Sequence, residues 1–278
     1  MTLARLDEVL ADAAAGGRGV GAFNVIQLEH AEALVDAAER TGLPVVLQIS
    51  ENAVRYHGSL APIALATRTI AERAGVPCVL HLDHAVSESL VDEAVALGFT
   101  SVMYDGSRLG DEANRTTTRA VVQRCHAAGV NVEAELGEIG GKDGVHAPGV
   151  RTDPAAAAQF VADCGVDALA VAVGSSHAMT SRTAELDMEL ITAIHERVPV
   201  PLVLHGASGV PDADLVAAVH AGMTKVNIAT HLNNAFTTAL RRHLAEDPDA
   251  VDTRRYLGSA RDAVAVEAAR LLVLLALR

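Results

Sequence analysis

Tryptophan is absent from this chain of 278 residues, and aromatic residues make up only 3% of it. Its core must therefore be built from Ala, Val, Leu and Ile, the residues that fill buried parallel strands and the helices covering them. The three cysteines, Cys78, Cys125 and Cys164, are odd in number and form no CxxC pair. This spacing argues against a disulfide framework or a thiolate zinc site, and it fits a reducing cytoplasm, where we expect the protein to reside.

Long apolar runs and an excess of basic charge are also missing. The formal net charge is −13, whereas a nucleic-acid partner requires a basic face. Residues 1–17 have a helical period with acidic residues, which predicts a first helix rather than a signal peptide. The apolar segment 265–278 is far shorter than the roughly 20 residues that cross a bilayer, so we expect it to pack on the rest of the protein or on a partner subunit. We predict neither a nucleic-acid partner nor a membrane.

Short apolar runs, in contrast, recur at the spacing of β/α units. Each reads as a buried parallel strand, and Ala-rich amphipathic segments, several of them ending in glycine, lie between them. A barrel of eight such units needs about 250 residues. We therefore predict an α/β fold, a single TIM (β/α)8 barrel domain over residues 1–278, with an open doubly wound sheet as the alternative. The runs cover residues 21–25, 44–50, 78–84, 101–107, 131–137, 168–177, 201–209 and 225–231.

Polar side chains gather where these runs end. In a TIM barrel the loops that follow the C-terminal strand ends build the site, so these side chains are expected to converge on one mouth. They are Asn24, Ser50, Asp83, His84, Asp105, Glu135, His177, His205 and Asn227.

Three of these residues, His84, His177 and His205, follow the third, sixth and seventh strands. A single loop histidine is commonplace, but three neutral imidazoles with one open position are a recurrent catalytic zinc set. Asp83, next to His84, is placed to move a proton to or from a substrate hydroxyl. The alternative for Asp83 is a solvated carboxylate or one that supports a ligand.

Two carboxylates, Glu133 and Glu135, share one face of the fifth strand. An ionised pair there is costly unless a cation lies near. Glu135 is closer to the mouth and is predicted to be an alternate metal ligand. His81, earlier in the third strand, is predicted to be structural or to orient a ligand.

Glycine-bearing strand ends suggest how a phosphate could be bound. The segments VGSSHA, LHGASG and NIAT are similar to the phosphate cradle that barrels form after their late strands, where small residues let backbone amides approach an anion. A lone glycine run is weak evidence, but two of these segments carry the predicted zinc histidines. The sequence therefore favours a phosphorylated substrate.

These motifs resemble those of the class II, zinc-dependent ketose-bisphosphate aldolases, a family that includes fructose- and tagatose-bisphosphate aldolases. The similarity runs through almost the whole chain, and the motifs occur in the family's order. They are LHLDH at 80–84, VMYDGS at 102–107, VEAELGEIGG at 132–141, GSSHA at 174–178, LHGASG at 204–209, KVNIAT at 225–230 and RRYLG at 254–258.

The resemblance implies reversible aldol cleavage of a ketose 1,6-bisphosphate to dihydroxyacetone phosphate and glyceraldehyde 3-phosphate. One catalytic Zn²⁺ on His84, His177 and His205 would polarise the ketose carbonyl, and Asp83 would take the proton from the hydroxyl next to the breaking bond. A monovalent cation beside the zinc stays open, and a homodimer or homotetramer is expected. The substrate-binding positions implied by the family's motifs are Asn24, Ser50, Ala178, Arg182, Gly206, Ala207, Ser208, Asn227, Ile228, Ala229, Thr230 and Arg254.

Several positions depart from the family's pattern. The acidic residues usual after the GG of the fifth loop are missing, and Asp143 is the nearby carboxylate that we predict to replace them as a catalytic residue. Ala178 stands where the family usually has Gly, and Arg182 lies next to the position of a missing lysine. Ala229 resembles the tagatose branch. Arg254, like Ser50, matches a contact to the far end of the sugar, and it is expected to serve a neighbouring subunit.

Three other functions compete with this one. A Schiff-base aldolase is disfavoured because the chain has only two lysines, Lys142 in a Gly-rich loop and Lys225, which the run 225–231 places at the start of the eighth strand. A metal-dependent phosphosugar isomerase or epimerase would use similar chemistry. A non-catalytic phosphosugar-binding subunit would explain the altered fifth loop, although the retained Asp83 counts against it.

Overall fold

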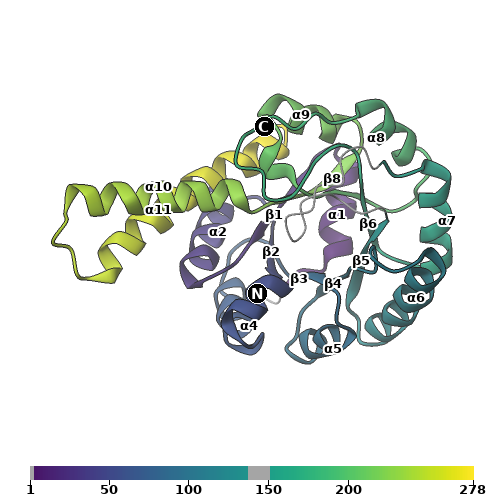
Figure 1. Ribbon diagram of the computed structural model, residues 1–278, viewed down its shortest axis with the longest axis horizontal. Helices are drawn as coiled ribbons and strands as arrows, with labels where there is room; N and C mark the ends of the chain where they lie inside the picture. Colours follow the sequence, from purple (N-terminus) through teal and green to yellow (C-terminus); the bar gives the residue numbers. More distant parts are fainter. Residues whose placement is uncertain (1–2, 137–150) are drawn as a thin grey trace.

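Eight parallel strands close into a barrel in the computed structural model, which describes residues 3–136 and 151–278 (Figure 1). Each strand pairs with the next in chain order, and β1 pairs with β8 to close the ring. The predicted TIM barrel is confirmed. The strands are β1 (Val20–Asn24), β2 (Val45–Ser50), β3 (Cys78–Ala85), β4 (Ser101–Tyr104), β5 (Asn131–Leu136), β6 (Ala168–Val171), β7 (Leu202–Leu204) and β8 (Met223–Ile228).

Helices follow the strands and cover the outside of the barrel (Figure 1). Their apolar faces pack on the outward-facing side chains of the strands and form one large buried cluster, as expected for amphipathic covering helices. They are α1 (Leu6–Ala15), α2 (Leu28–Thr41), α3 (Glu51–His57), α4 (Ala61–Ala71), α5 (Glu88–Ala96), α6 (Asp111–Ala127), α7 (Pro154–Cys164), α8 (Met188–His195), α9 (Asp212–His220), α10 (Thr230–Glu246) and α11 (Thr253–Leu275).

Glycines end several of these helices in the way that the sequence predicts. Gly42 after α2 and Gly165 after α7 both adopt the left-handed conformation, with φ of 65° and 73°. Glycine has no Cβ and adopts this conformation at little cost, so the chain can turn sharply out of the helix and start the next strand. The short αβ loops keep the strands in register.

The first helix closes the N-terminal end of the barrel. Leu6, Val9 and Leu10 of α1 form a second buried cluster with inward-facing residues of β1, β2, β3, β6 and β7. The backbone N–H of Ala4 donates to the carbonyl of Cys78 at 2.9 Å, which fixes the chain just before α1 against the start of β3. The functional mouth can therefore lie only at the opposite, C-terminal end.

The last two helices leave the barrel as a hairpin. In Figure 1, α10 and α11 run side by side and extend away from the ring of strands, and the C-terminal part of α11 returns to it. Leu271, Leu272 and Leu275 near the C-terminus are buried, so the apolar segment 265–278 packs on the protein itself. None of the helices within the described ranges has the length and apolarity needed to cross a membrane.

Several strand boundaries differ from the sequence prediction, and two of these differences concern site residues. Strand β6 ends at Val171, so residues 172–177 form a loop rather than the second half of a strand. Strand β8 begins at Met223, which makes Lys225 its third residue and turns its side chain into the barrel interior. The prediction that Lys225 opens the strand was wrong because the apolar run was taken to begin at the charged residue.

Candidate active site

The barrel interior changes from apolar to polar along its axis. At the N-terminal end it is filled by small apolar side chains such as Ala22, Val79 and Ala170. Two residues further along β1 and β3, Asn24 and His81 follow, and Glu133 and Lys225 are fully buried inside the ring. Buried charged groups are costly unless they are paired, and they cluster at functional sites. This polar layer therefore indicates a functional site next to it, toward the C-terminal end of the barrel.

A β-bulge in β3 brings two consecutive residues to the mouth. Side chains in a strand alternate between its faces, so Asp83 and His84 should point in opposite directions. Between Leu82 and Ala85, however, β3 contains one residue more than β4 opposite, and His84 has a φ of 50°. This bulge turns the imidazole of His84 inward beside the carboxylate of Asp83, and such strain is typical of functional positions.

The three predicted histidines converge above the polar layer. The ring centroid of His84 lies 5.0 Å from that of His177 and 4.6 Å from that of His205. One ligand nitrogen from each ring lies within 4.8 Å of the others, and a second group that can hold a metal consists of His84, Asp105 and Glu135. His84 thus belongs to both groups, and Glu135 belongs to the second.

The donor atoms at this point fit a metal ion. His84 Nε2 and His205 Nδ1 are buried and make no hydrogen bond within the described residues, although Glu135 Oε2 lies 3.3 Å from His205 Nδ1. Leaving buried polar atoms without a partner is costly, and a cation held by these nitrogens would satisfy them. Three imidazoles with carboxylates nearby are the ligand types that zinc and related transition metals take.

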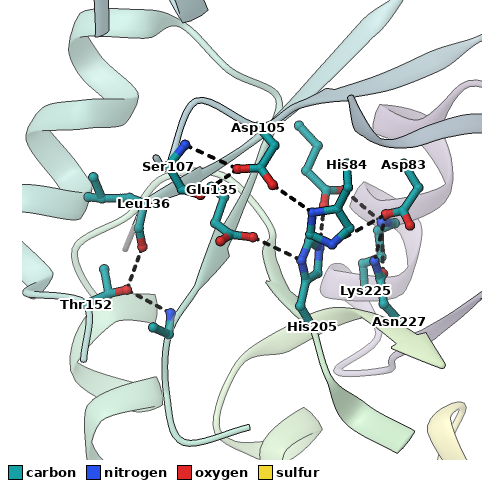
Figure 2. A network of polar contacts seen from close by, with 12 residues as sticks. Asp83, His84, Asp105, Ser107, Glu135, Leu136, Thr152, His205, Lys225 and Asn227 are labelled. Carbon is teal, nitrogen blue, oxygen red and sulfur yellow. Dashed lines mark hydrogen bonds and ion pairs between the residues drawn. The ribbon is translucent and has the colours of Figure 1, made fainter. Parts of the chain in front are cut away.

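Carboxylates behind the histidines fix the orientation of two rings. His84 Nδ1 lies 2.9 Å from Asp105 Oδ2 (Figure 2), and His205 Nε2 lies 2.9 Å from Glu133 Oε1. Each contact leaves the other ring nitrogen facing the shared centre, which is how metal-binding histidines are usually oriented. The sequence predicts Asp105 at the mouth but assigns no role to it. In the structure Asp105 orients the ring of His84.

His205 is held by two carboxylates at once. Its Nδ1 lies 3.3 Å from Glu135 Oε2, in addition to the Glu133 contact through Nε2. Burial lowers the pKa of His205, but the neighbouring carboxylates of Glu133 and Glu135 outweigh burial and raise this pKa to about 9. Because a ligating imidazole must be neutral, metal binding at Nδ1 would release a proton here.

Glu133 and Lys225 form a buried ion pair beneath the histidines. Lys225 Nζ lies 2.8 Å from Glu133 Oε2, and both side chains are fully buried. Burial raises the pKa of Glu133, but Lys225 and His205 lower it by more than burial raises it. The carboxylate is therefore ionised. His81 lies at the edge of this pair, with Nε2 3.8 Å from Glu133 Oε2, and burial lowers its pKa to about 3. His81 therefore contacts the residue that orients His205.

Asp83 receives amide groups on both of its oxygens. Asn24 Nδ2 donates to Oδ2 at 3.3 Å, and Asn227 Nδ2 donates to Oδ1 at 3.5 Å. Burial raises the pKa of Asp83, whereas His84, His205 and Lys225 lower it, and the result lies below the ordinary value. An ionised carboxylate in a fixed position is what a proton acceptor at this place requires.

Backbone turns after β6, β7 and β8 form a candidate phosphate cradle. Gly206 is left-handed, and a Cβ there would lie 2.6 Å from the backbone of Ser176. The Ser208 hydroxyl accepts hydrogen bonds from the backbone N–H groups of Ala229 and His231, at 3.1 and 3.2 Å, which ties this turn to the start of α10. Turns and a helix N-terminus with exposed N–H groups suit an anion.

A cavity of about 670 Å³ opens over these residues at the C-terminal face. Its size suits a small-molecule substrate. His205 and Glu135 are fully buried beneath it, and Ala207 and Ile228 are buried beside it. The predicted residues that line the cavity are Asn24, Ser50, Asp83, His84, His177, Ala178, Gly206, Ser208, Asn227, Ala229 and Thr230.

Several lining residues carry polar or charged side chains that the sequence analysis does not predict. Gln48 is a polar residue inside an apolar strand, a signal that could have identified it. Arg55, Tyr56 and Arg108 also line the cavity. They belong to α3 and to the loop after β4, where no motif marks them.

Ser50 lines the cavity and also caps α3 with its hydroxyl, which accepts from the Ala53 N–H at 3.2 Å. The Arg182 guanidinium lies outside the cavity lining and donates to the carbonyl of Val210 and to Asp212. Arg254 begins α11 far from the mouth, 88% exposed and paired with Asp252. Asp143 falls outside the described residues.

A closed barrel with a histidine and carboxylate metal group at the C-terminal strand ends defines a TIM-barrel enzyme with a metal-assisted site. The sequence model of fructose-bisphosphate aldolase class-II matches residues 4–276. The chain is 39% identical over 268 residues to the probable fructose-bisphosphate aldolase of Bacillus subtilis, covering 95% of this chain and 94% of that protein. It is equally identical to the fructose-bisphosphate aldolase of Geobacillus stearothermophilus, covering 95% and 93%.

A solved structure agrees with these similarities. The crystal structure of the YdjI aldolase from Escherichia coli K12 superposes with a TM-score of 0.87 at 33% identity, covering 99% of this chain and 97% of that one. The chain therefore belongs to the class-II fructose-bisphosphate aldolase family. It is an aldolase, a carbon–carbon lyase, of a metal-dependent family, and it carries residues that can hold the metal.

Proposed function

We propose that this chain is a zinc-dependent aldolase that reversibly cleaves a ketose 1,6-bisphosphate of the fructose or tagatose type. The products are dihydroxyacetone phosphate and glyceraldehyde 3-phosphate. The observation that supports this most directly is the convergence of His84, His177 and His205 beside the buried carboxylate of Asp83. The reaction needs a group that polarises the carbonyl and a proton acceptor, and the two must lie close to one another.

Residues of this chain are suited to both requirements of the cleavage reaction, a polarised carbonyl and a proton acceptor. Bound zinc supplies Lewis-acid chemistry, polarising the ketose carbonyl. In the cleavage direction, the Asp83 carboxylate takes the proton from the hydroxyl on the carbon next to the bond that breaks. Asn24 and Asn227 hold this carboxylate from both sides, so it meets the hydroxyl in one orientation.

The turns at Gly206, Ser208 and Thr230 are proposed to bind the phosphate of the dihydroxyacetone-phosphate half. All three residues line the cavity, and Ala178, Asn227 and Ala229 lie along the same wall. Backbone N–H groups act on an anion at contact distance, which compensates for the chain's net charge of −13. Ala229 has no side-chain group that can hydrogen-bond to the sugar. Other residues of the cavity lining are therefore proposed to distinguish fructose from tagatose.

The proton that returns to dihydroxyacetone phosphate needs a second group. We propose Asp143, because it is the nearby carboxylate in the segment after β5 where the resemblance implies an acid. An Asp143→Asn variant is expected to keep its zinc and lose turnover. Full turnover with zinc bound would contradict this role.

We also propose a homodimer or homotetramer in which Arg254 contacts the far end of the sugar in a neighbouring subunit. Arg254 lies at the start of α11, in the α10–α11 hairpin, and does not line the cavity of its own chain. An arginine suits a phosphate, because its guanidinium can make paired hydrogen bonds to two oxygens.

Cleavage assays on two sugars test the proposed function. Zinc-loaded protein is incubated with fructose and tagatose 1,6-bisphosphates in parallel, and the release of triose phosphate is measured for the wild type and for Asp83→Asn. We expect release from at least one sugar and a loss of about 10²–10⁴-fold in the variant, the usual contribution of a positioned acid–base group. The variant should retain its metal, because Asp83 is not a ligand.

Absence of release from both sugars, with zinc bound, would contradict the proposal. Interconversion of the sugars without triose would indicate the isomerase or epimerase. Binding without any turnover would indicate the non-catalytic phosphosugar-binding subunit.

A further inference from the structure

Lys225 is an ammonium group sealed inside the barrel, beneath the cavity. It is fully buried and does not line the cavity, so it cannot touch a substrate. A buried charge is costly unless it is paired and hydrogen-bonded. Lys225 has two such contacts, Glu133 Oε2 at 2.8 Å and Asn227 Oδ1 at 2.9 Å. The second contact reaches a residue of the cavity wall.

The contact to Asn227 determines which end of its amide faces the cavity. An ammonium group can only donate hydrogen bonds, so it must meet the amide oxygen and not the amide nitrogen. With Oδ1 held by Lys225, Nδ2 is left to face Asp83 Oδ1 at 3.5 Å (Figure 2). The two ends of the amide are nearly equal in size, so sterics alone would not choose between them. The reversed amide would set its oxygen against the carboxylate.

A parallel arrangement exists on the other side of Asp83. Gln48 Nε2 donates to Asn24 Oδ1 at 2.8 Å, and Asn24 Nδ2 then faces Asp83 Oδ2. A buried donor therefore lies behind each of the two asparagines that hold Asp83. Lys225 acts on the Asn227 side and makes no contact with Asn24 among its hydrogen bonds and ion pairs in the described residues.

We infer that Lys225 is a positioning residue of the aldol reaction, which orients the Asn227 amide so that its NH₂ group points at Asp83 and at the substrate. This inference rests on the proposed function. Its ion pair with Glu133 keeps the ammonium in place, and the other oxygen of Glu133 holds His205. Lys225 thus supports both a substrate contact and the orientation of a metal-site histidine while remaining outside the cavity.

Proton exchange on dihydroxyacetone phosphate provides the test, because it needs no second substrate. Zinc-loaded protein in D₂O is given dihydroxyacetone phosphate, and NMR follows the loss of protons from its hydroxymethyl carbon. One C–H bond breaks, and a deuteron from solvent replaces the proton. We expect Lys225→Met and Asn227→Ala each to lower the exchange rate by about 10- to 100-fold, the usual effect of losing one hydrogen bond to a charged group.

The double variant decides whether Lys225 acts through Asn227. If it does, Lys225→Met in the Asn227→Ala background lowers the rate by no more than about twofold, since the amide it orients is gone. The matched control is Lys225→Met in the Asn24→Ala background, where the two losses should multiply. Zinc content is measured for every variant, so that loss of metal is not mistaken for loss of orientation.

If Lys225→Met does not fold, Lys225→Met with Glu133→Gln replaces it, because this pair leaves no buried charge without a partner. The same two comparisons are then made on that background. Losses that multiply with both asparagine variants, or an unchanged rate in Lys225→Met, would overturn the inference while leaving the proposed function intact. A wild type that neither exchanges these protons nor cleaves either sugar would overturn the proposed function and the inference with it.

Discussion

Two residues at the mouth, His84 and Ala178, hold a left-handed backbone that residues with a Cβ adopt only at a cost. At His84 the strain accompanies the bulge that turns the ring inward. Ala178 directly follows His177, a proposed metal ligand, at a position where the sequence resemblance places glycine. Both residues therefore carry strain next to the chemistry, as functional sites often do.

Replacing Ala178 by glycine should relieve this strain. With φ of 59° the methyl group is unfavourable, so Ala178→Gly is expected to raise the free energy of unfolding by about 0.5–1 kcal/mol. Urea unfolding of metal-free protein measures the difference. Ala207→Gly, in the short 3-10 turn of the cradle, is the control and should lower stability by a similar amount. A destabilised Ala178→Gly protein would show that the strain has been wrongly assigned.

At this scale the sequence prediction depends on one rule, that polar residues at C-terminal strand ends converge. The rule selects Asp83, His84, His177 and His205, whose side chains the structure does bring together, while their roles stay predictions. It could not foresee that a bulge is needed for Asp83 and His84 to face the same way, since a bulge depends on the pairing with β4. It also left Lys225 without a role, because the depth of a residue in the barrel depends on strand register.

Among the helices, α2 and α10 meet through a buried histidine that lies outside the site. The ring of His30 stacks on Phe236 with centroids 5.1 Å apart, and His30 is only 4% exposed. Burial lowers the pKa of His30 to about 4 from its ordinary value of 6.5. This contact therefore tolerates only the neutral imidazole.

Stability should fall in mild acid because of this residue. The unfolded chain takes up the His30 proton near pH 6.5 and the folded protein only near pH 4, so the folded state is fully favoured above pH 6.5 and loses about 3 kcal/mol as the pH falls to 4. His30→Phe keeps a ring against Phe236 and should remove this part of the decline in urea midpoints. Phe236→Leu keeps the imidazole and should retain it. Equal slopes in wild type and His30→Phe would contradict the assignment.

Helices were predicted more accurately than strand ends. The 3.6-residue period and the terminal glycines of α2 and α7 are local signals, and the structure confirms them. The end of β6 was placed too late because the apolar composition continues through Ala172 and Val173 into the loop, and only pairing with β5 and β7 determines where the strand stops.

At the scale of the whole molecule, the α10–α11 hairpin is a part of the fold that a TIM barrel does not require. It extends away from the ring of strands and carries Arg254 near its far end (Figure 1). An arginine that contacts substrate from this position can do so only in another subunit. The prediction of one domain over residues 1–278 stays a prediction, as does the oligomeric state.

Mixing two inactive variants tests the shared site. Arg254→Ala lacks the arginine, and Asp83→Asn lacks the proton acceptor, so each alone should be nearly inactive. In a mixed dimer, the Arg254→Ala chain keeps its own Asp83 and receives Arg254 from its partner. Random reassortment should restore about a quarter of the wild-type sites, because half of the dimers are mixed and each has one complete site. No gain after refolding the variants together would contradict the crossing arginine.

Metal titration of the chelator-treated enzyme tests the central claim most directly. Three histidines, one from each of three strand ends, should bind a single catalytic ion. We predict that triose-phosphate release stops on chelation and returns in proportion to added Zn²⁺, reaching its maximum near one ion per chain. Full cleavage by metal-free protein, or unchanged metal uptake after His84, His177 and His205 are all replaced by alanine, would contradict it.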